Sequence, residues 1–331
     1  MSKKSEQTFD AVIKEINNGV RFLVASHVNP EGDAVGSTLA LALGLKELKK
    51  DVTAYLYDPV PAAFKFLPFA DKVVSKAPED KIYDAIFVVD CGQNDRIGED
   101  FSRIKNKGKL INIDHHATNT RFGDINIINP DASAAGEMIY DLLNAISVAI
   151  TPEIATNIYT SILTDTGSFR YSSATPRAFS ISAEMVRLGA EPWEISQKVY
   201  ESQPANKLKL LASVLNTLEV SSDGKIATLF VTLDMLNKAK AAKEVVDGFV
   251  NYARAIEGVE IGILFRESKP GEYKLSFRSR GRIDVAQIAQ GFGGGGHMNA
   301  AGCNVKGNLK DIMEQVVNTV EKRIYEAAMN Q

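Results

Sequence analysis

Three short apolar runs, each ending abruptly in acidic or histidine residues, constrain the fold of this chain more than any other feature. The runs are rich in Val, Ile and Phe, which is typical of strands in a parallel sheet that is covered on both faces. The runs and the residues that follow them are 22–26 with His27, 86–89 with Asp90, and 109–113 with Asp114. Because ligands bind at the carboxyl edge of such a sheet, we predict that these side chains meet at one site.

The pattern of helices and strands divides the 331 residues into two α/β parts. In the first part, helices alternate with strands predicted at 20–26, 52–57, 84–89 and 109–113. After about residue 217 the strand patterns start afresh, at 226–232, 259–266 and 273–279. The sequence therefore predicts a mainly parallel-sheet domain over 1–200, a connecting helix or linker over 201–217, and a smaller α/β domain over 218–331.

Composition and charge narrow the possible classes of function. The net charge of −3 argues against a protein that coats long nucleic acids, although a locally basic pocket for a short phosphorylated ligand remains possible. Cys91 and Cys303 are too few for a disulfide framework and indicate a reducing compartment. The N-terminus has no apolar segment after its basic residues, and no apolar run approaches the roughly 18 residues that span a bilayer. We expect a cytoplasmic protein without membrane contact.

Acidic residues and a histidine stand out in three segments, each of which has a simpler explanation when taken alone. The loop after the first run contains His27, Glu31 and Asp33, and Asp33 stands where a helix N-cap would stand. Asp90 at a strand end could start a turn, and Asp165 could belong to a polar helix terminus. A helix cap does not account for His27 at a strand end, and metal binding is the alternative interpretation of all three segments.

The triplet Asp114-His115-His116 is the strongest of the four clusters. Adjacent side chains on an extended segment point to opposite sides, so we expect the two histidines to have different roles. One would bind metal while the other would face the substrate, and Asp114 could orient an imidazole.

Taken together, the four clusters indicate a centre for two metal ions. Asp and His suit Mn, Fe, Co or Zn, and the number of candidate ligands, about five or six, exceeds that of a tetrahedral zinc site. Two ions that share a bridging carboxylate generate hydroxide and stabilise an in-line phosphoryl displacement. The residues therefore predict hydrolysis of a phosphate ester or anhydride.

A glycine run in the second part of the chain precedes His297 and consists of Gly293, Gly294, Gly295 and Gly296. Consecutive glycines can turn successive backbone N–H groups toward one anion. Upstream, Arg278, Arg280 and Arg282 concentrate positive charge, and Arg can bind phosphate through two hydrogen bonds. A flexible linker and a solvated strand edge are the alternatives, but the flanking strand and helix patterns favour phosphate binding. No Gly-Lys-Ser/Thr follows the glycines, so the run is not a P-loop.

In this order, the motifs resemble those of the DHH phosphoesterase superfamily, which takes its name from the triplet at 114–116. The resemblance covers nearly the whole chain. Within the superfamily, the chain is most similar to the nanoRNase branch. Members of that branch degrade very short oligoribonucleotides and dephosphorylate 3′-phosphoadenosine 5′-phosphate (pAp), and some relatives hydrolyse pApA. The resemblance implies a hydrolase with two Mn²⁺ ions that releases nucleoside monophosphates from short oligoribonucleotides or pApA, and phosphate from pAp. Family members often pair as homodimers.

The resemblance also implies a role for each motif residue. One ion would be bound by His27, Glu31 and Asp90, and the other by Asp33, Asp90, His115 and Asp165. His116 and Asp114 would be the catalytic pair, with His116 at the scissile phosphate or the leaving group. The residues expected to bind substrate are Arg170, Arg278, Ser279, Gly293, Gly294, Gly295, Gly296 and His297. The family usually has Asp where this chain has Glu31, a change that would weaken the first site.

Two alternatives stay open on the sequence alone. A manganese-dependent inorganic pyrophosphatase resembles the same superfamily, but it would need a more cationic, closed site. A catalytically weak nucleotide sensor would keep the fold without turnover. Only Glu31 supports the sensor, whereas the other predicted ligands count against it.

Overall fold

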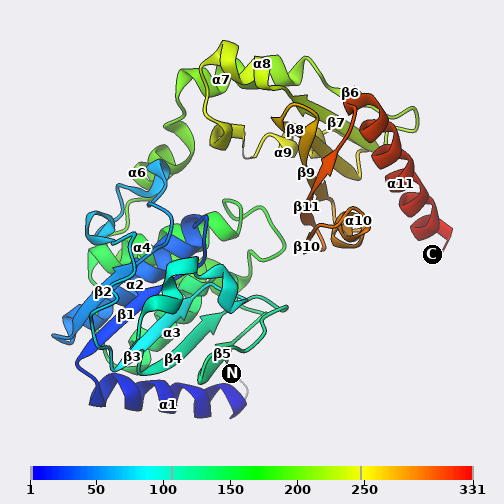
Figure 1. Cartoon of the computed structure of the whole chain (residues 1–331). Helices are drawn as coiled ribbons and strands as arrows, with labels where there is room; N and C mark the ends of the chain where they lie inside the picture. The colour runs from blue at the N-terminus through cyan, green and yellow to red at the C-terminus, as the bar shows by residue number, and fades with distance from the viewer. Residues whose placement is uncertain (1–2, 106, 247, 330–331) are drawn as a thin grey trace. The chain divides into compact units, whose positions relative to one another are not determined.

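The computed structural model describes residues 3–105, 107–246 and 248–329, and the chain divides into two compact units between Ser202 and Gln203 (Figure 1). Each unit has its own sheet and its own apolar core. The region expected to connect the domains corresponds to helix α7 (Ala205–Leu215), which buries Leu210 and Val214 in the core of the second unit. The helix therefore packs as part of that unit.

The first unit contains a five-stranded, wholly parallel sheet in the order β2-β1-β3-β4-β5. Its strands are β1 (Arg21–Ala25), β2 (Asp51–Tyr55), β3 (Ala85–Val89), β4 (Lys109–Asp114) and β5 (Ile125–Ile128). The predicted parallel sheet is thus confirmed. The sequence analysis missed β5, a four-residue edge strand that is only partly buried and therefore lacks the pattern of a central strand.

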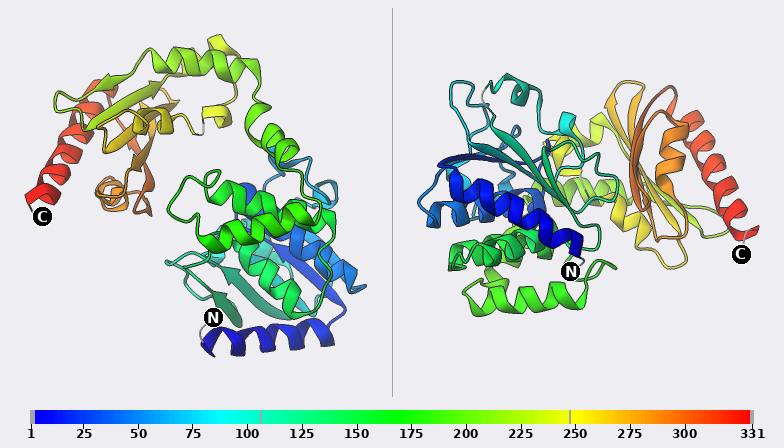
Figure 2. Two further views of the ribbon diagram at one scale, coloured as in Figure 1. Left: turned by 180° about the vertical axis from the view of Figure 1, so that it is seen from behind. Right: turned by 90° about the horizontal axis from the view of Figure 1, so that it is seen from below.

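Side chains of these strands alternate between two apolar layers. Phe22 and Val24 of β1 face one layer, whereas Leu23 and Ala25 face the other. The first layer is helical (Figures 1 and 2) and contains α1 (Lys3–Asn18), α2 (Gly32–Glu47), α3 (Ala135–Ala145), α4 (Pro152–Asp165) and α5 (Pro176–Arg187). The second layer is built from short turns, η3 (Asn94–Arg96) and η4 (Glu99–Arg103), around Ile97 and Phe101. Both faces of the sheet are covered, as its apolar strands require.

The second unit contains a six-stranded mixed sheet in the order β10-β11-β9-β8-β7-β6. Its strands are β6 (Glu219–Val220), β7 (Ile226–Val231), β8 (Ile261–Lys269), β9 (Glu272–Ser279), β10 (Gly295–His297) and β11 (Ala300–Lys306). Helices α10 (Val285–Gly291) and α11 (Leu309–Met329) pack against one core, and α7, α8 (Leu233–Ala239) and α9 (Val250–Arg254) against the other. The second α/β part is confirmed, although β6, α8, β10 and β11 were not predicted.

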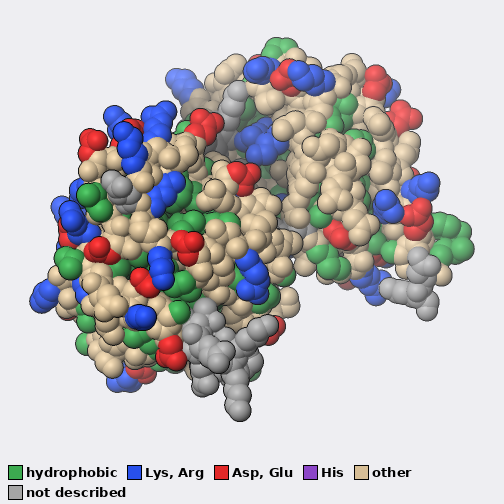
Figure 3. All heavy atoms as spheres, turned by 60° about the horizontal axis from the view of Figure 1, so that its bottom comes forward, with side chains coloured by type: hydrophobic (Ala, Val, Ile, Leu, Met, Phe, Trp, Pro, Cys, Tyr) green, Lys and Arg blue, Asp and Glu red, His purple; other side chains and the backbone are tan. Residues whose placement is uncertain are grey.

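The remaining short elements are η1 (Ala62–Phe64), η2 (Ala70–Lys72), α6 (Pro192–Ser196), the π-helical turn η5 (Gln197–Glu201) and η6 (Lys243–Val246). On the face drawn in Figure 3, Lys and Arg side chains are interspersed with Asp and Glu. Among the described residues, no helix combines the length and the hydrophobicity that crossing a membrane requires.

Candidate functional site

The predicted ligands come together at the carboxyl edge of the parallel sheet. His27, Asp90 and His115 directly follow or lie just beyond strands β1, β3 and β4, which are neighbours in the sheet. Asp33 lies in the first turn of α2 and Asp165 is the last residue of α4, a helix that packs against α2. Within the described residues, three groups have ligand atoms no more than 4.8 Å apart: His27 with Glu31 and Asp90, Asp33 with His115 and Asp165, and Asp90 with His115 and His116.

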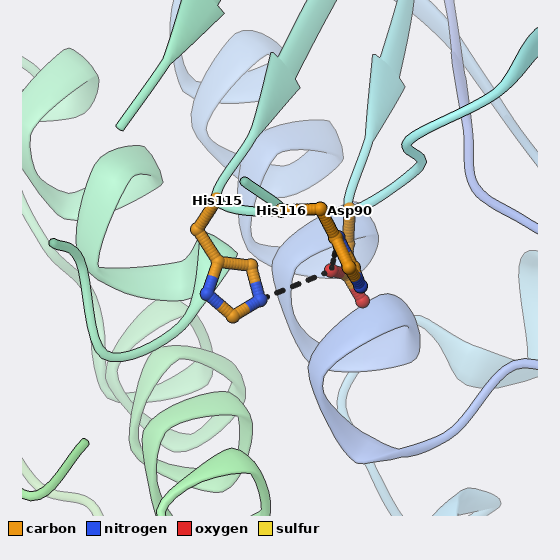
Figure 4. Close-up of side chains that lie close together, drawn as sticks. All are labelled: Asp90, His115 and His116. Atoms are coloured by element: carbon orange, nitrogen blue, oxygen red, sulfur yellow. Dashed lines mark ion pairs between the residues drawn. The ribbon is translucent and has the colours of Figure 1, made fainter. Parts of the chain in front are cut away.

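Asp90 is shared by two of these groups, and Figure 4 shows its ion pairs with His115 and His116. Its Oδ2 is 3.6 Å from Nε2 of His27, and its Oδ1 is 3.5 Å from Nε2 of His115 and 3.7 Å from Nδ1 of His116. The backbone of Asp90 is left-handed, with φ of 52°, and its N–H donates to the Ile113 carbonyl at 2.9 Å. Among the described residues Oδ1 has no hydrogen-bond partner although it is buried, so a cation would satisfy an otherwise costly oxygen.

The simpler explanation of Asp33 was that it is the N-cap of α2, and this explanation is wrong. Glu31 is the N-cap, and its Oε1 accepts from the Ala34 N–H at 3.4 Å. The carboxylate of Asp33 instead accepts from the backbone N–H groups of Ala135 and Gly136, at 2.7 and 3.2 Å, and from the hydroxyl of Ser161. These bonds hold one buried carboxylate toward His115, whose Nε2 is 3.5 Å away.

Backbone carbonyls set the orientation of two imidazoles. Nδ1 of His27 lies 2.8 Å from the Val28 carbonyl oxygen, and Nδ1 of His115 lies 3.2 Å from that of Ala132. A carbonyl oxygen only accepts hydrogen bonds, so Nδ1 carries the hydrogen in both rings. Nε2 of each ring then points at the carboxylates, which is the orientation that a metal-binding histidine needs.

His115 and His116 do not point to opposite sides, contrary to the prediction from an extended segment. Strand β4 ends at Asp114, so both histidines lie beyond it, and their ring centroids are only 5.0 Å apart. Their hydrogen bonds nevertheless differ, because Nδ1 of His116 is 2.7 Å from Oδ1 of Asp114. The other oxygen of Asp114 accepts from Nδ2 of Asn119 at 2.6 Å. Asp114 is thus placed to orient His116, and the sequence analysis did not identify Asn119.

The electrostatics of the cluster reflect many buried acids around few cations. Burial opposes charge on His27 and His115, yet the adjacent carboxylate of Asp90 and the other acids around each ring raise the pKa of each to about 11. Burial and the charges of Asp90 and Glu31 raise the pKa of Asp165 to about 6, against the opposing effect of His115. Burial, Asp90 and Asp165 also raise the pKa of Asp33.

In the absence of another cation, the protonated imidazoles of His27 and His115 balance the negative charge of the acids. Burial opposes ionisation of Asp90, but His115 and His27 hold its pKa below the usual range. A divalent cation would supply the same compensation more strongly, because imidazole nitrogens and carboxylate oxygens are its natural donors. The donor set therefore fits metal ions.

Comparisons with known proteins agree with this geometry. Residues 21–162 match the DHH family, N-terminal domain, and residues 223–326 match the DHHA1 domain. The bifunctional oligoribonuclease and PAP phosphatase NrnA of Thermus thermophilus is 34% identical over 92% of this chain and 90% of that protein. The chain belongs to the DHH phosphoesterase family. The Bacillus subtilis protein of the same name is 25% identical over 89% of this chain and 92% of its own length.

A solved structure supports the membership. An exopolyphosphatase-related protein from Bacteroides fragilis superposes with a TM-score of 0.89 and 28% identity, and the match covers 97% of this chain and 96% of that one. The DHH domain of this chain thus carries the candidate metal centre, and the DHHA1 domain forms most of the second unit.

The DHHA1 domain has a small cationic cavity on one face of its sheet. The cavity has a volume of about 100 Å³, and its polar lining consists of Arg266, Lys274, Ser276 and Arg278. Lys274, Ser276 and Arg278 alternate along β9 and so share one face, while Arg266 pairs with Lys274 across β8. Arg278 was predicted, but the other three were not, although the alternation Lys-Leu-Ser-Phe-Arg could have revealed two of them.

Ser279, predicted to bind substrate beside Arg278, lies on the opposite face of β9. Its side chain is 2% exposed, and its hydroxyl oxygen accepts from the Gly281 N–H at 3.0 Å. Since successive residues of a strand point to opposite faces, Ser279 cannot join Arg278 at one ligand without a distortion of the strand. The structure gives Ser279 a role in the turn after β9 instead.

The glycine run does not form the expected cluster of anion-binding N–H groups. The N–H groups of Gly293 and Gly294 donate to the carbonyls of Gln290 and Ala289, at 3.0 and 2.8 Å, and so terminate α10. Gly295 and Gly296 belong to β10, and a Cβ at Gly296 would lie 2.5 Å from the Ala300 carbonyl oxygen. The glycines therefore permit a tight helix-to-strand connection, which explains the run without a ligand.

Arg170 and His297 were also predicted to bind substrate. Arg170 is exposed, and its Nε donates to the carbonyl of Gly167 at 2.7 Å, within a turn where Gly167, Ser168 and Phe169 all have positive φ. The backbone of His297 lies in β10, but its side chain is outside the described part of the structure.

Proposed function

We propose that this phosphoesterase uses two Mn²⁺ ions to hydrolyse short oligoribonucleotides, or linear dinucleotides such as pApA, to nucleoside monophosphates, and that it also converts pAp to AMP and phosphate. The first ion binds His27, Glu31 and Asp90, and the second binds Asp33, Asp90, His115 and Asp165. The observation that carries the proposal is the position of Asp90, whose buried carboxylate is common to two groups of candidate ligands.

The ions would supply activated water and would neutralise charge on the phosphate. The chain itself holds the carboxylates and imidazoles in place through backbone hydrogen bonds to Asp33, His27 and His115. Groups fixed before the substrate binds need little rearrangement during the reaction.

His116 is suited to protonate the leaving oxygen. Burial opposes its charge, but Asp114 raises its pKa, so the ring carries a proton more readily than a free histidine. With Nδ1 held by Asp114, Nε2 is the nitrogen that would give its proton to the leaving oxygen as the P–O bond breaks and the water oxygen bonds to phosphorus.

The cationic cavity favours a nucleotide as the substrate. Arg266, Lys274 and Arg278 present three positive side chains around a polar Ser276, as a phosphate group or the polar edge of a base would require. The names of the Thermus thermophilus and Bacillus subtilis relatives support the same substrate class. Arg170 and His297 remain proposed substrate contacts, and the glycines before His297 would shape that segment.

The experiment that tests the function offers pApA, a short RNA, pAp and inorganic pyrophosphate to the purified chain with Mn²⁺. Release of AMP or other nucleotides from the first three, lost in His115→Ala, is the expected result. Phosphate from pyrophosphate alone would replace the proposal with the pyrophosphatase alternative. Tight nucleotide binding without turnover in any metal would leave the sensor.

A further inference from the structure

One segment, at the end of the β5–α3 connection and the start of α3, contacts two candidate ligands of the second ion. Its Ala132 carbonyl oxygen lies 3.2 Å from Nδ1 of His115, and its Ala135 and Gly136 N–H groups donate to Asp33. These are separate bonds, to a residue just beyond β4 and to a residue of α2, yet they come from five consecutive residues. The path of the 132–136 segment therefore sets the orientation of both ligands together.

The side chain of Glu137 holds this segment in place through its bonds to Ser133. Its side chain is buried, with 4% of its surface exposed. One carboxylate oxygen accepts from both the N–H and the hydroxyl of Ser133, at 3.1 and 2.7 Å. The other accepts from Nε of Arg177 on α5 at 2.9 Å. A buried carboxylate is retained only where such bonds compensate its desolvation, so Glu137 and Ser133 fix each other.

We propose that Glu137 is a positioning residue, which acts through the 132–136 segment to hold Asp33 and His115 in the geometry that the second ion needs. This inference rests on the proposed metal centre and adds a residue that touches neither ion nor substrate.

A helix cap alone does not account for these contacts. Glu137 stands in the first turn of α3, where acids often accept from N–H groups near the start of their own helix. In α3, however, the N–H groups of Ala135 and Gly136 are bonded to Asp33, so the start of the helix is also a support for the candidate ligand. Gly136 is required there, because a Cβ would lie 2.1 Å from the Ser161 hydroxyl oxygen.

The chain offers a matched set of variants. Glu137→Ala removes the acceptor for Ser133, whereas Glu137→Gln keeps one amide oxygen for both Ser133 bonds and loses only the bond from Arg177. Asp141→Asn is the control, because Asp141 also binds Arg177 but does not bond to Ser133. His27→Ala identifies the first site, since His27 belongs to the other group of ligands.

The measurement is Mn²⁺ binding by isothermal titration and electron paramagnetic resonance, with thermal unfolding of the metal-free chain. We expect Glu137→Ala to weaken one of two sites by about 10–100-fold, as loss of a support behind a ligand typically does. The weakened site must differ from the site that is lost in His27→Ala. The double variant, Glu137→Ala with His27→Ala, should lose both sites. Glu137→Gln and Asp141→Asn should stay within about threefold of the wild type, in line with intact ligand support.

Other results would overturn the inference. If Glu137→Ala binds both ions normally, Glu137 is a structural residue. The same conclusion follows if the variant weakens both sites equally and also lowers the unfolding temperature. If Glu137→Ala does not fold, Ser133→Ala decides, because it keeps the backbone bond and should weaken the same site by a smaller factor. Unchanged binding in Ser133→Ala would then contradict the role. A wild-type chain that binds no divalent metal would overturn the proposed metal centre and with it this inference.

Discussion

The candidate metal centre and the cationic cavity are both made of charged side chains, but the chain holds them in different ways. In the DHH domain, Asp33, Asp90 and Asp114 are each at most 2% exposed, and His27 and His115 are oriented by backbone carbonyls. In the DHHA1 domain, Arg266, Lys274 and Arg278 stand on one face of β8 and β9, where Val246 and Val250 also line the cavity, and they are partly or fully exposed. The first region is a buried network whose members constrain one another, whereas the second is a group of cations that are more exposed to solvent.

The difference predicts where mutations will act. Removing one member of a buried charged network leaves its partners without compensation, so effects there are large and coupled. Removing one partly solvated cation loses one contact and leaves the others in place. Changes in the first region should therefore affect metal binding and kcat, and changes in the second should affect mainly KM.

Asp90→Asn should have the largest effect, because it alters the carboxylate shared between groups. We expect loss of at least one bound metal ion and a decrease in turnover on the order of 10³-fold, equivalent to the several kcal/mol that metal ions contribute. Asn tolerates the left-handed backbone at this position, so the local chain path should persist. Metal analysis and kinetics test this, with Asp95→Asn on exposed η3 as the control. Full metal content with normal turnover would show that Asp90 is no ligand.

The pH dependence of metal affinity should be the next largest effect. In the metal-free chain the pKa values of His27 and His115 are about 11, so both rings are protonated between about pH 6 and 8. A ligand imidazole must be neutral, so binding releases these protons and the affinity rises about tenfold per pH unit for each proton released.

Titration calorimetry in two buffers of different ionisation enthalpy would count these protons. Below about pH 6, protonation of Asp165 should weaken binding further, because its pKa is about 6. If the affinity for metal ions does not change with pH, the candidate metal centre does not behave as a buried, coupled network. The contrast with the more solvated cavity would then no longer hold.

Asp114→Asn should affect turnover without removing metal. The variant loses the charge that orients His116 and raises its pKa, so we expect kcat to fall about 10–100-fold with unchanged KM. The part of the pH–rate profile that depends on protonated His116 should move to lower pH, because the pKa falls when the anion is removed. Asp131→Asn, an exposed aspartate, is the control. Loss of metal in Asp114→Asn would make Asp114 a ligand instead.

The sequence was sufficient for the architecture because it depends on local patterns. Apolar runs that end in Asp or His predict parallel strands whose carboxyl ends meet, and His27, Asp90 and His115 do meet there. Contacts between distant segments were out of reach. Whether Glu31 or Asp33 caps α2 is decided by Ala135, Gly136 and Ser161, which attract Asp33 from more than a hundred residues away. The glycines before His297 were misinterpreted because the strand that pairs with them, β11, became visible only in the folded chain.

Arg278→Ala should give the smallest of these effects and the one most specific to the second region. Arg278 lines the same cavity as Lys274, so its removal should raise KM for pApA by about tenfold, the typical loss of a hydrogen bond to a charged group. Metal content and kcat should not change, because the centre is held by bonds within the DHH domain.

Lys274→Ala should raise KM by a smaller factor, since a solvated ammonium contributes less than a planar guanidinium that can make two bonds. Lys238→Ala provides the control, as Lys238 is an exposed cation on α8 that pairs with Asp234. A decrease in kcat with unchanged KM in Arg278→Ala would mean that the cavity acts on the reacting phosphate itself. The contrast between a buried, constrained centre and cations exposed to solvent would then no longer hold.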